Sequence, residues 1–260
     1  MKAFLFDVDG TLADTERDGH RVAFNLAFQE AGLDWDWGVE LYGQLLAVTG
    51  GKERIRYYLE HFNTAFSAPA DLDAFIAGLH QAKTAHYTRL LAEGAIPLRP
   101  GVERLLREAR EAGLRLAIAT TTTPANVTAL IDHTLGHEAL DWFEVIAAGD
   151  VVPAKKPAPD IYTWALAKMD LPPAACVAFE DSANGILAAR DADLLTLVTV
   201  NDFTRDHDFD AAALVVDQLG EPGAPFTVLA GELEGIRHQG MVDVELVRQL
   251  HQQHQRQRVA

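Results

Sequence analysis

Short apolar runs alternate with longer amphipathic segments along most of the chain. The runs have the length of buried strands, and the segments between them place apolar residues at helical spacing. The expected strands are Ala3–Phe6, Leu114–Ala119, Val145–Ala148, Cys176–Phe179, Leu194–Val200 and Ala213–Val216. The expected helices are Val102–Ala112, Pro124–Leu135, Asp160–Met169 and Gly185–Ala192. This alternation predicts an α/β fold in which helices cover both faces of a parallel sheet.

One long stretch near the N-terminus departs from this alternation. From Thr15 to about Leu91 the pattern is helical, with segments at Gly19–Ala31, Val39–Leu46, Lys52–His61 and Leu72–Leu91. A connection of this length is too long for a loop between two strands. We therefore predict a core domain at residues 1–15 and 92–220 and an inserted helical domain at 16–91. A C-terminal extension at 221–260 is expected to carry a helix at Met241–Leu250 that frays toward its end.

Composition and charge narrow the class of partner. The chain is 48% hydrophobic and 23% charged, as in folded proteins, and its 22 basic and 38 acidic residues give a net charge of −16. Without a basic tract, this charge argues against nucleic acid or an anionic membrane as partner. Cys176 is the single cysteine, no apolar run is long enough to span a bilayer, and no secretory signal follows Met1. We expect a cytoplasmic monomer.

The strongest chemical signal is the segment Phe6-Asp7-Val8-Asp9-Gly10-Thr11. It places two acids two positions apart at the end of a buried strand, where open α/β sheets bind ligands. Neighbouring acids repel each other unless they share a cation or a proton. The alternative is an ordinary Asp-Gly turn after a strand.

Three further polar groups follow expected strands. Thr120 comes after Leu114–Ala119, Lys155-Lys156-Pro157 follows Val145–Ala148 after a loop, and Glu180-Asp181 comes after Cys176–Phe179. Because the carboxyl ends of parallel strands meet at one edge, we expect these groups to gather in one crevice. Carboxylates, a hydroxyl and an ammonium together suit a hard cation and a phosphoryl group.

In this order, Asp-x-Asp-Gly-Thr, Thr, Lys-Pro and Glu-Asp resemble the motifs of the haloacid dehalogenase (HAD) superfamily of phosphatases. Further segments resemble the CbbY-type sugar phosphatases of that superfamily: Asp14–Arg21, Thr49–Arg54, Gly78–Thr84, Ala119–Asn126, Ala148–Pro153 and Lys155–Tyr162. The resemblance implies a Rossmann-like three-layer core with an inserted helical cap. Members remove a phosphate from xylulose 1,5-bisphosphate, an inhibitor of Rubisco, and β-phosphoglucomutase is a close relative.

The resemblance also implies roles for the core residues. Asp7 is expected to attack phosphorus, and Asp9 to protonate the leaving group and then deprotonate water. Thr120 and Lys156 are expected to stabilise the transferring phosphoryl group. Lys155 is the competing candidate, but the family lysine directly precedes the proline.

A Mg²⁺ cofactor is implied in the same way. Its expected ligands are Asp7, the backbone carbonyl of Asp9, and Asp181. Glu180 is a direct ligand in some relatives and lies behind the ligands in others, so its contact with the ion stays open.

Substrate recognition is assigned to the cap. The matching positions are His20, Gly51, Lys52, Arg54, His80 and Lys83. Glu16 is interpreted as a sugar contact or a helix cap. Further substrate-side candidates are Thr121, Thr122 and Asn126, with helix capping at Pro124 as the alternative. Taken without the resemblance, the spacing of Lys52, Arg54 and Lys83 favours a solvated helix face.

The remaining unusual side chains are interpreted as structural. They are Trp35, Trp37, Trp142 and Trp164 as packing residues, Cys176 as a small buried hydrophobe, and His251 and His254 as solvated residues of the tail.

These observations favour a Mg²⁺-dependent phosphatase that acts through an aspartyl phosphate on a small sugar phosphate, with xylulose 1,5-bisphosphate favoured. A phosphosugar mutase of the β-phosphoglucomutase type shares every core residue and is the first alternative. A receiver-like signalling domain also gathers acids, a Thr and a Lys around Mg²⁺. The position of Asp7 on the first strand and the long insertion after it argue against that third reading.

Overall fold

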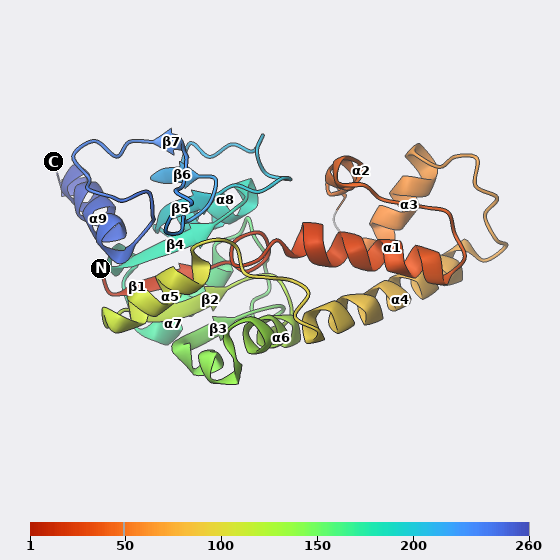
Figure 1. The fold of residues 1–260 in the computed structure, drawn as a ribbon, viewed down its shortest axis with the longest axis horizontal. Coiled ribbons are helices and arrows are strands. Elements are labelled where there is room, and N and C mark those ends of the chain that lie inside the picture. The colour runs from red at the N-terminus through yellow and green to blue at the C-terminus, as the bar shows by residue number, and fades with distance from the viewer. Residues whose placement is uncertain (49, 260) are drawn as a thin grey trace. The chain divides into compact units, whose positions relative to one another are not determined.

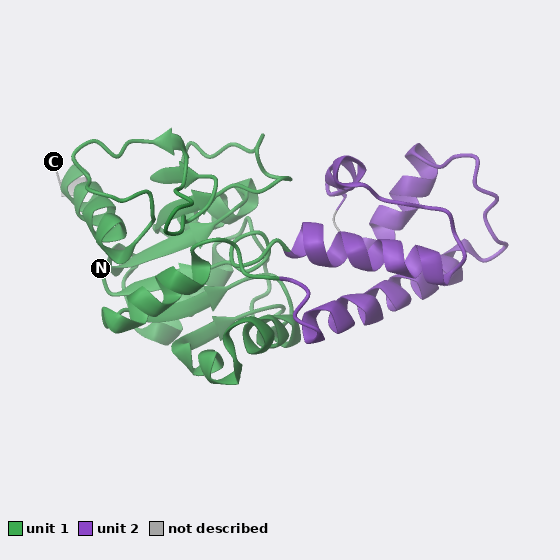
Figure 2. Ribbon diagram, in the orientation of Figure 1, with its two compact units in different colours: residues 1–14, 97–260 green, residues 15–96 purple. Residues whose placement is uncertain are grey.

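The chain leaves its sheet domain after the first strand and returns to it once. In the computed structural model, which describes residues 1–48 and 50–259, this path produces two units (Figure 2). Unit 1 comprises Met1–Asp14 and the chain from Pro97 onward, and unit 2 comprises Thr15–Ile96. The predicted insertion had bounds of 16–91, and the predicted extension from 221 falls within unit 1.

A seven-stranded sheet forms the centre of unit 1, in the order β3-β2-β1-β4-β5-β6-β7 (Figure 1). The strands are β1 (Ala3–Phe6), β2 (Arg115–Ala119), β3 (Phe143–Ala147), β4 (Cys176–Glu180), β5 (Leu195–Thr199), β6 (Leu214–Val216) and β7 (Val228–Gly231). The first six are parallel to one another. Every residue of β1, β4 and β5 is buried, which explains why they appear in the sequence as continuous apolar runs.

The edge strand β7 was not among the expected strands. It pairs antiparallel with β6, and all four of its residues are exposed. This strand was missed because an exposed edge strand needs no buried apolar run, so the hydrophobic pattern carries no signal for it.

Helices cover both faces of the sheet. They are α5 (Val102–Glu111), α6 (Pro124–Leu135), α7 (Asp160–Met169), α8 (Ala183–Asp191) and α9 (Val244–Val259), with short 3-10 helices η2 (His137–Trp142) and η3 (Pro173–Ala175). α7 packs on β2 and β3, and α8 packs on β4 and β5. α5 packs on β2 and against α9, and Figure 1 shows α5 in front of the sheet and α7 behind it. This layering confirms the predicted fold class.

The C-terminal helix α9 is longer than expected. It begins at Val244, after Asp243 accepts a hydrogen bond from Leu246 N, and remains helical to Val259 instead of fraying. The prediction that His251 is solvated is wrong. Its side chain is buried, and Nε2 lies 2.8 Å from the carbonyl oxygen of Ala174. The apolar residues Leu246, Val247 and Leu250 are buried beside it and anchor the helix to unit 1.

Unit 2 is helical. A π-helix η1 (Thr15–His20) precedes α1 (Arg21–Glu30), where one continuous helix from Gly19 was expected, and α2 (Val39–Leu45), α3 (Gly51–His61) and α4 (Leu72–Ala92) follow. α1 packs along α4. Trp35 and Trp37 are buried among aromatic rings, which confirms that they are packing residues. The longest helix has 21 residues, yet no helix in the described part of the chain is apolar enough to cross a membrane.

Candidate active site

The polar groups predicted from the strand ends lie at one edge of the sheet in unit 1. β1 is flanked by β2 and β4, and its last residue Phe6 is level with Ile118 on one side and Phe179 on the other. Asp7 follows β1 and donates its backbone N–H to Phe179 O at 3.0 Å, while Thr120 follows β2 and Glu180 ends β4. The parallel register therefore brings residues from three distant parts of the sequence to the same level.

Three buried carboxylates converge there. Asp7, Glu180 and Asp181 each offer one oxygen atom, and these atoms all lie within 4.8 Å of one another. Burial disfavours the charged forms, and although Lys156 opposes it, the pKa of Glu180 is raised to about 7. Burial together with Asp7 and Glu180 likewise raises the pKa of Asp181 well above its ordinary value. A nearby positive charge would therefore stabilise the ionised forms of these carboxylates.

Lys156 supplies part of that charge. Its Nζ donates hydrogen bonds to Asp7 Oδ1 at 2.7 Å, Glu180 Oε1 at 2.6 Å and the carbonyl oxygen of Ala119 at 2.8 Å. Burial alone lowers the pKa of Lys156, but the two carboxylates outweigh it and raise that pKa above its ordinary value. Lys155, in contrast, is exposed and lies 3.0 Å from Asp150. The structure therefore brings Lys156 rather than Lys155 to Asp7.

The donor atoms around the acids fit a Mg²⁺ ion. Within the described residues, Glu180 Oε2 is buried and has no hydrogen-bond partner, while Oε1 accepts from Lys156 and from Tyr162. Asp181 Oδ2 accepts from Asn201 Nδ2 at 2.7 Å. Carboxylate oxygens are the ligands that Mg²⁺ prefers. Three buried carboxylates that each offer one oxygen within 4.8 Å of the others are therefore the arrangement that such an ion would satisfy.

The turn after β1 is shaped around these acids. Gly10 has φ +85°, and a side chain there would collide with the Asp181 carboxylate and the Asn201 amide. Asp9 is half-buried in the same turn, and Thr120 is buried. The Asp-Gly pair therefore has a steric role beyond that of an ordinary surface turn.

The loop after β2 places the remaining unit 1 candidates. Thr121 is exposed, and Thr122 Oγ1 accepts from Asn126 Nδ2 at 3.3 Å. Helix α6 is capped by Thr123, whose Oγ1 accepts from Asn126 N. The threonine before Pro124 thus takes the capping role, and Thr121 and Thr122 do not.

In unit 2, Glu16 and Arg54 share a buried network. Tyr42 OH donates to Glu16 Oε2 at 2.6 Å and accepts from Arg54 Nη1 at 2.8 Å, and the ion pair between Arg54 and Glu16 measures 3.9 Å. One carboxylate oxygen of Glu16, Oε2, is used in this network. The solvated-face alternative is wrong for Arg54, which is buried.

A second unit 2 network joins His20 and Lys83. Lys83 Nζ lies 2.8 Å from His20 Nδ1, and the imidazole stacks on Tyr87. Burial, reinforced by the positive charge of Lys83, lowers the pKa of His20 to about 4. The neutral imidazole therefore accepts the hydrogen bond from the Lys83 ammonium. Lys83 is itself buried, so the solvated-face alternative is wrong for it as well.

The other cap candidates lie at the start of α3 and on α4. Gly51 opens α3, and the His80 ring lies so close to it that a side chain at this position would collide. Lys52 is exposed, in agreement with the solvated-face alternative. Thr49, which belongs to the same motif, lies outside the described residues.

Sequence reasoning missed three residues of these networks: Tyr42, Tyr162 and Asn201. Tyr42 and Tyr162 sit on helices at positions that predict only core packing. Asn201 follows the apolar run of β5, so the rule that located Thr120 and Glu180 would have found it too.

Comparison with known proteins shows the family to which the chain belongs. A family model for the haloacid dehalogenase-like hydrolases matches residues 1–193, which contain every acid, hydroxyl and lysine of the unit 1 cluster. The chain belongs to this family. A haloacid dehalogenase-like hydrolase with CbbY-like sequence is a phosphatase, so the predicted enzyme class is confirmed.

Similar proteins lie within the CbbY group of the family. Protein CbbY of Rhodobacter capsulatus is 54% identical over 212 residues, which are 82% of this chain and 91% of that protein. CbbY from Rhodobacter sphaeroides in complex with phosphate is 50% identical, with a TM-score of 0.71 over 86% of this chain and 96% of that one. A mutant CbbY from the same organism, in complex with xylulose 1,5-bisphosphate, is 49% identical with a TM-score of 0.71 over 85% and 96%.

Proposed function

We propose that this hydrolase removes a phosphate from a small sugar phosphate, with Mg²⁺ as cofactor and an aspartyl phosphate on Asp7 as intermediate. The observation that carries the proposal is the contact between Asp7 and Lys156 inside a buried cluster of carboxylates. A carboxylate held beside an ammonium at the carboxyl edge of the sheet is suited to attack phosphorus.

Mg²⁺ would be held by Asp7, Asp181 and the backbone carbonyl of Asp9, with Glu180 as a further ligand or a support behind them. When bound, it would supply positive charge that offsets the repulsion between the nucleophile and the substrate phosphate. The three buried carboxylate oxygens within 4.8 Å of one another support a place for the ion in this set.

In the first step, an Asp7 oxygen forms a bond to phosphorus while the ester P–O bond breaks and Asp9 gives its proton to the departing alkoxide. In the second step, Asp9 takes a proton from water, whose oxygen bonds to phosphorus as the aspartyl P–O bond breaks and inorganic phosphate leaves. The Lys156 ammonium would neutralise phosphoryl charge in both steps, and the Thr120 hydroxyl would donate a hydrogen bond to it.

Sugar recognition is proposed for unit 2 and for the loop after β2. In unit 2 the proposed residues are Glu16, His20, Gly51, Lys52, Arg54, His80 and Lys83. In the loop they are Thr121, Thr122 and Asn126. Buried positive charge at Arg54 and Lys83 supports an anionic substrate despite the net charge of the chain. The resemblance to CbbY bound to xylulose 1,5-bisphosphate favours that bisphosphate.

The test is a phosphate-release assay with Mg²⁺ on sugar monophosphates and bisphosphates, comparing xylulose 1,5-bisphosphate with ribulose 1,5-bisphosphate. We expect fastest release from xylulose 1,5-bisphosphate and none from the Asp7→Asn variant. Isomerised sugar phosphate without phosphate release would replace this proposal by the mutase. Stable phosphorylation of the protein without turnover would replace it by the receiver-like alternative, against which membership of a hydrolase family argues.

A further inference from the structure

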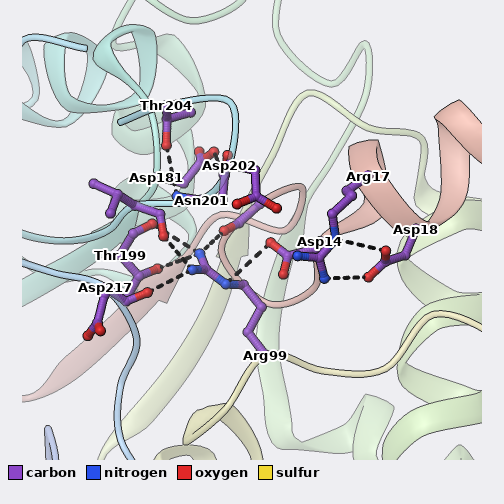
Figure 3. Close-up of polar contacts among 12 residues, drawn as sticks. Asp14, Arg17, Asp18, Arg99, Asp181, Thr199, Asn201, Asp202, Thr204 and Asp217 are labelled. Carbon is purple, nitrogen blue, oxygen red and sulfur yellow. Dashed lines mark hydrogen bonds and ion pairs between the residues drawn. The ribbon is translucent and has the colours of Figure 1, made fainter. Parts of the chain in front are cut away.

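The Arg99 side chain is buried in unit 1 and makes an unusual set of contacts with backbone (Figure 3). It lies just after the chain returns to unit 1 and before α5. Its guanidinium donates to Gly10 O, to both Thr199 O and Thr199 Oγ1 at 3.0 Å, to Val200 O at 2.5 Å and to Asp217 O at 3.0 Å. Its Nε lies 3.4 Å from Asp14 Oδ1.

These acceptors come from three strand ends that are not all neighbours. Gly10 lies in the turn after β1, Thr199 ends β5, and Asp217 follows β6. β4 lies between β1 and β5, and it carries the acids Glu180 and Asp181 at its end. Arg99 therefore joins the turn after β1 to the ends of β5 and β6, on either side of the β4 acids.

The same residue also holds the nucleophile turn through its main chain. Arg99 N donates to Leu12 O at 2.8 Å, and Leu98 pairs with Ala13 in an isolated antiparallel bridge. Both the backbone and the side chain of Arg99 thus hold the segment that follows Asp7 and Asp9.

The contact of Arg99 with the end of β5 connects it to Asp181. Asn201 directly follows Val200, whose carbonyl Arg99 binds, and donates to Asp181 Oδ2 at 2.7 Å. Gly10 packs so tightly against Asp181 and Asn201 that a side chain there would collide with both. A movement of the Gly10 turn would therefore shift the Asp181 carboxylate as well.

Only a guanidinium can serve this many acceptors. It presents five N–H donors in a rigid planar fork, whereas an ammonium has three. Lysine at this position would leave carbonyls of the buried cluster without a donor.

We propose that Arg99 is a positioning residue of the hydrolysis reaction. It fixes the Asp7–Gly10 turn against Asp181 and Asn201, so that nucleophile, acid-base residue and metal ligands are held in reactive alignment. The inference rests on the proposed aspartyl-phosphate chemistry. A misplacement of about 1 Å in such a site can lower the rate about 100-fold.

Arg104 provides a matched control. It also lies in unit 1, and its Nη2 donates to three backbone carbonyls, those of Leu219 at 3.1 Å, Gly220 at 2.8 Å and Val242 at 3.2 Å. These carbonyls belong to the C-terminal part of the chain and not to the nucleophile turn. Substituting Arg104 removes a similar backbone clamp without touching the turn.

The experiment compares Arg99→Met with Arg104→Met, and Arg99→Lys with Arg104→Lys. We expect Arg99→Met to lower kcat about 100-fold with KM within about threefold of the unmodified protein. Arg99→Lys should recover part of this loss. Both Arg104 variants should keep kcat within about threefold while lowering the melting temperature. If Arg99→Met does not fold, the comparison of kcat between Arg99→Lys and Arg104→Lys tests the inference.

A second readout needs no turnover. Mg²⁺ is titrated into the substrate-free proteins while their melting temperature is recorded. To reach half of the Mg²⁺-induced rise in melting temperature, only the Arg99 variants should need at least about fivefold more Mg²⁺ than the unmodified protein. Equal kcat and equal Mg²⁺ response in the Arg99 and Arg104 pairs would overturn the inference, because Arg99 would then act on stability alone. If the unmodified protein released no phosphate, the proposed function would fail, and the Mg²⁺ titration would still decide whether Arg99 aligns the acids.

Discussion

Replacing Lys156 by Met tests the electrostatics of the cluster directly. The change keeps much of the apolar stem but removes the Nζ that donates to Asp7 and Glu180. Charge-assisted hydrogen bonds contribute about 1.5–3 kcal/mol each, and breaking a buried ion pair by removing one partner costs about 3–5 kcal/mol. The Lys156 side chain is only 6% exposed, so solvent cannot replace it. We expect a loss of about 3–5 kcal/mol in the free energy of unfolding.

The assay is urea denaturation in EDTA, followed by circular dichroism, together with phosphate release in Mg²⁺. Lys155→Met is the matched control. The Lys155 side chain is half exposed, and its ion pair with Asp150 contributes at most about 1 kcal/mol. Lys156→Met should also lower kcat by about 100- to 1000-fold, the usual effect of removing one group that stabilises transition-state charge. Lys155→Met should leave kcat unchanged.

Mg²⁺ separates the two effects of Lys156. Added Mg²⁺ should return part of the lost stability, since it brings positive charge to the same carboxylates, but it should not return the lost rate. If Lys156→Met and Lys155→Met were equally stable and their kcat values differed less than tenfold, the argument that Lys156 balances the buried acids would be refuted.

Four further outcomes are expected. Asp7→Asn should abolish phosphate release without loss of secondary structure in circular dichroism, and EDTA should inactivate the unmodified protein until Mg²⁺ is added back. Tyr42→Phe removes the hydroxyl between Glu16 and Arg54 and should lower the free energy of unfolding by about 1–3 kcal/mol in urea. Because the pKa of His20 falls from 6.5 in the unfolded chain to about 4 in the fold, the unfolded state binds more protons between these values. Stability should therefore decrease as pH falls from 6.5 to 4, by up to about 3 kcal/mol, and His20→Gln should flatten this slope in urea titrations.

The sheet and the edge that carries the candidate site were predictable because buried strands appear in the sequence as apolar runs. In a parallel sheet the central strands are covered on both faces, so β1, β4 and β5 are unbroken apolar runs whose ends can be located. The polar residue after each run then falls at the carboxyl edge. The exposed strand β7 has no such mark, and its antiparallel pairing depends on a turn of the chain that periodicity does not encode.

Hydrogen-bond networks were less predictable because their members are far apart in the sequence. The Arg99 guanidinium donates to carbonyls 89 to 118 positions away, and the hydroxyl of Tyr42 on α2 joins Glu16 on η1 to Arg54 on α3. None of these pairs repeats with a helical or strand period. Asn201 differs, because it lies two residues after the buried strand β5, a place from which its role could be inferred.

For the same reason, spacing alone did not predict the burial of two charged residues in unit 2. Their burial bears on the proposed function. Helical spacing favours solvent for Arg54 and Lys83, yet both are buried against Tyr42, His20 and aromatic rings. Removing such charges from water costs several kcal/mol each, and apolar side chains of similar size would stabilise a helical unit at least as well. Packing alone therefore does not account for them. The phosphate of the proposed substrate would bring negative charge to both side chains, so their burial agrees with the substrate-binding role proposed for Arg54 and Lys83.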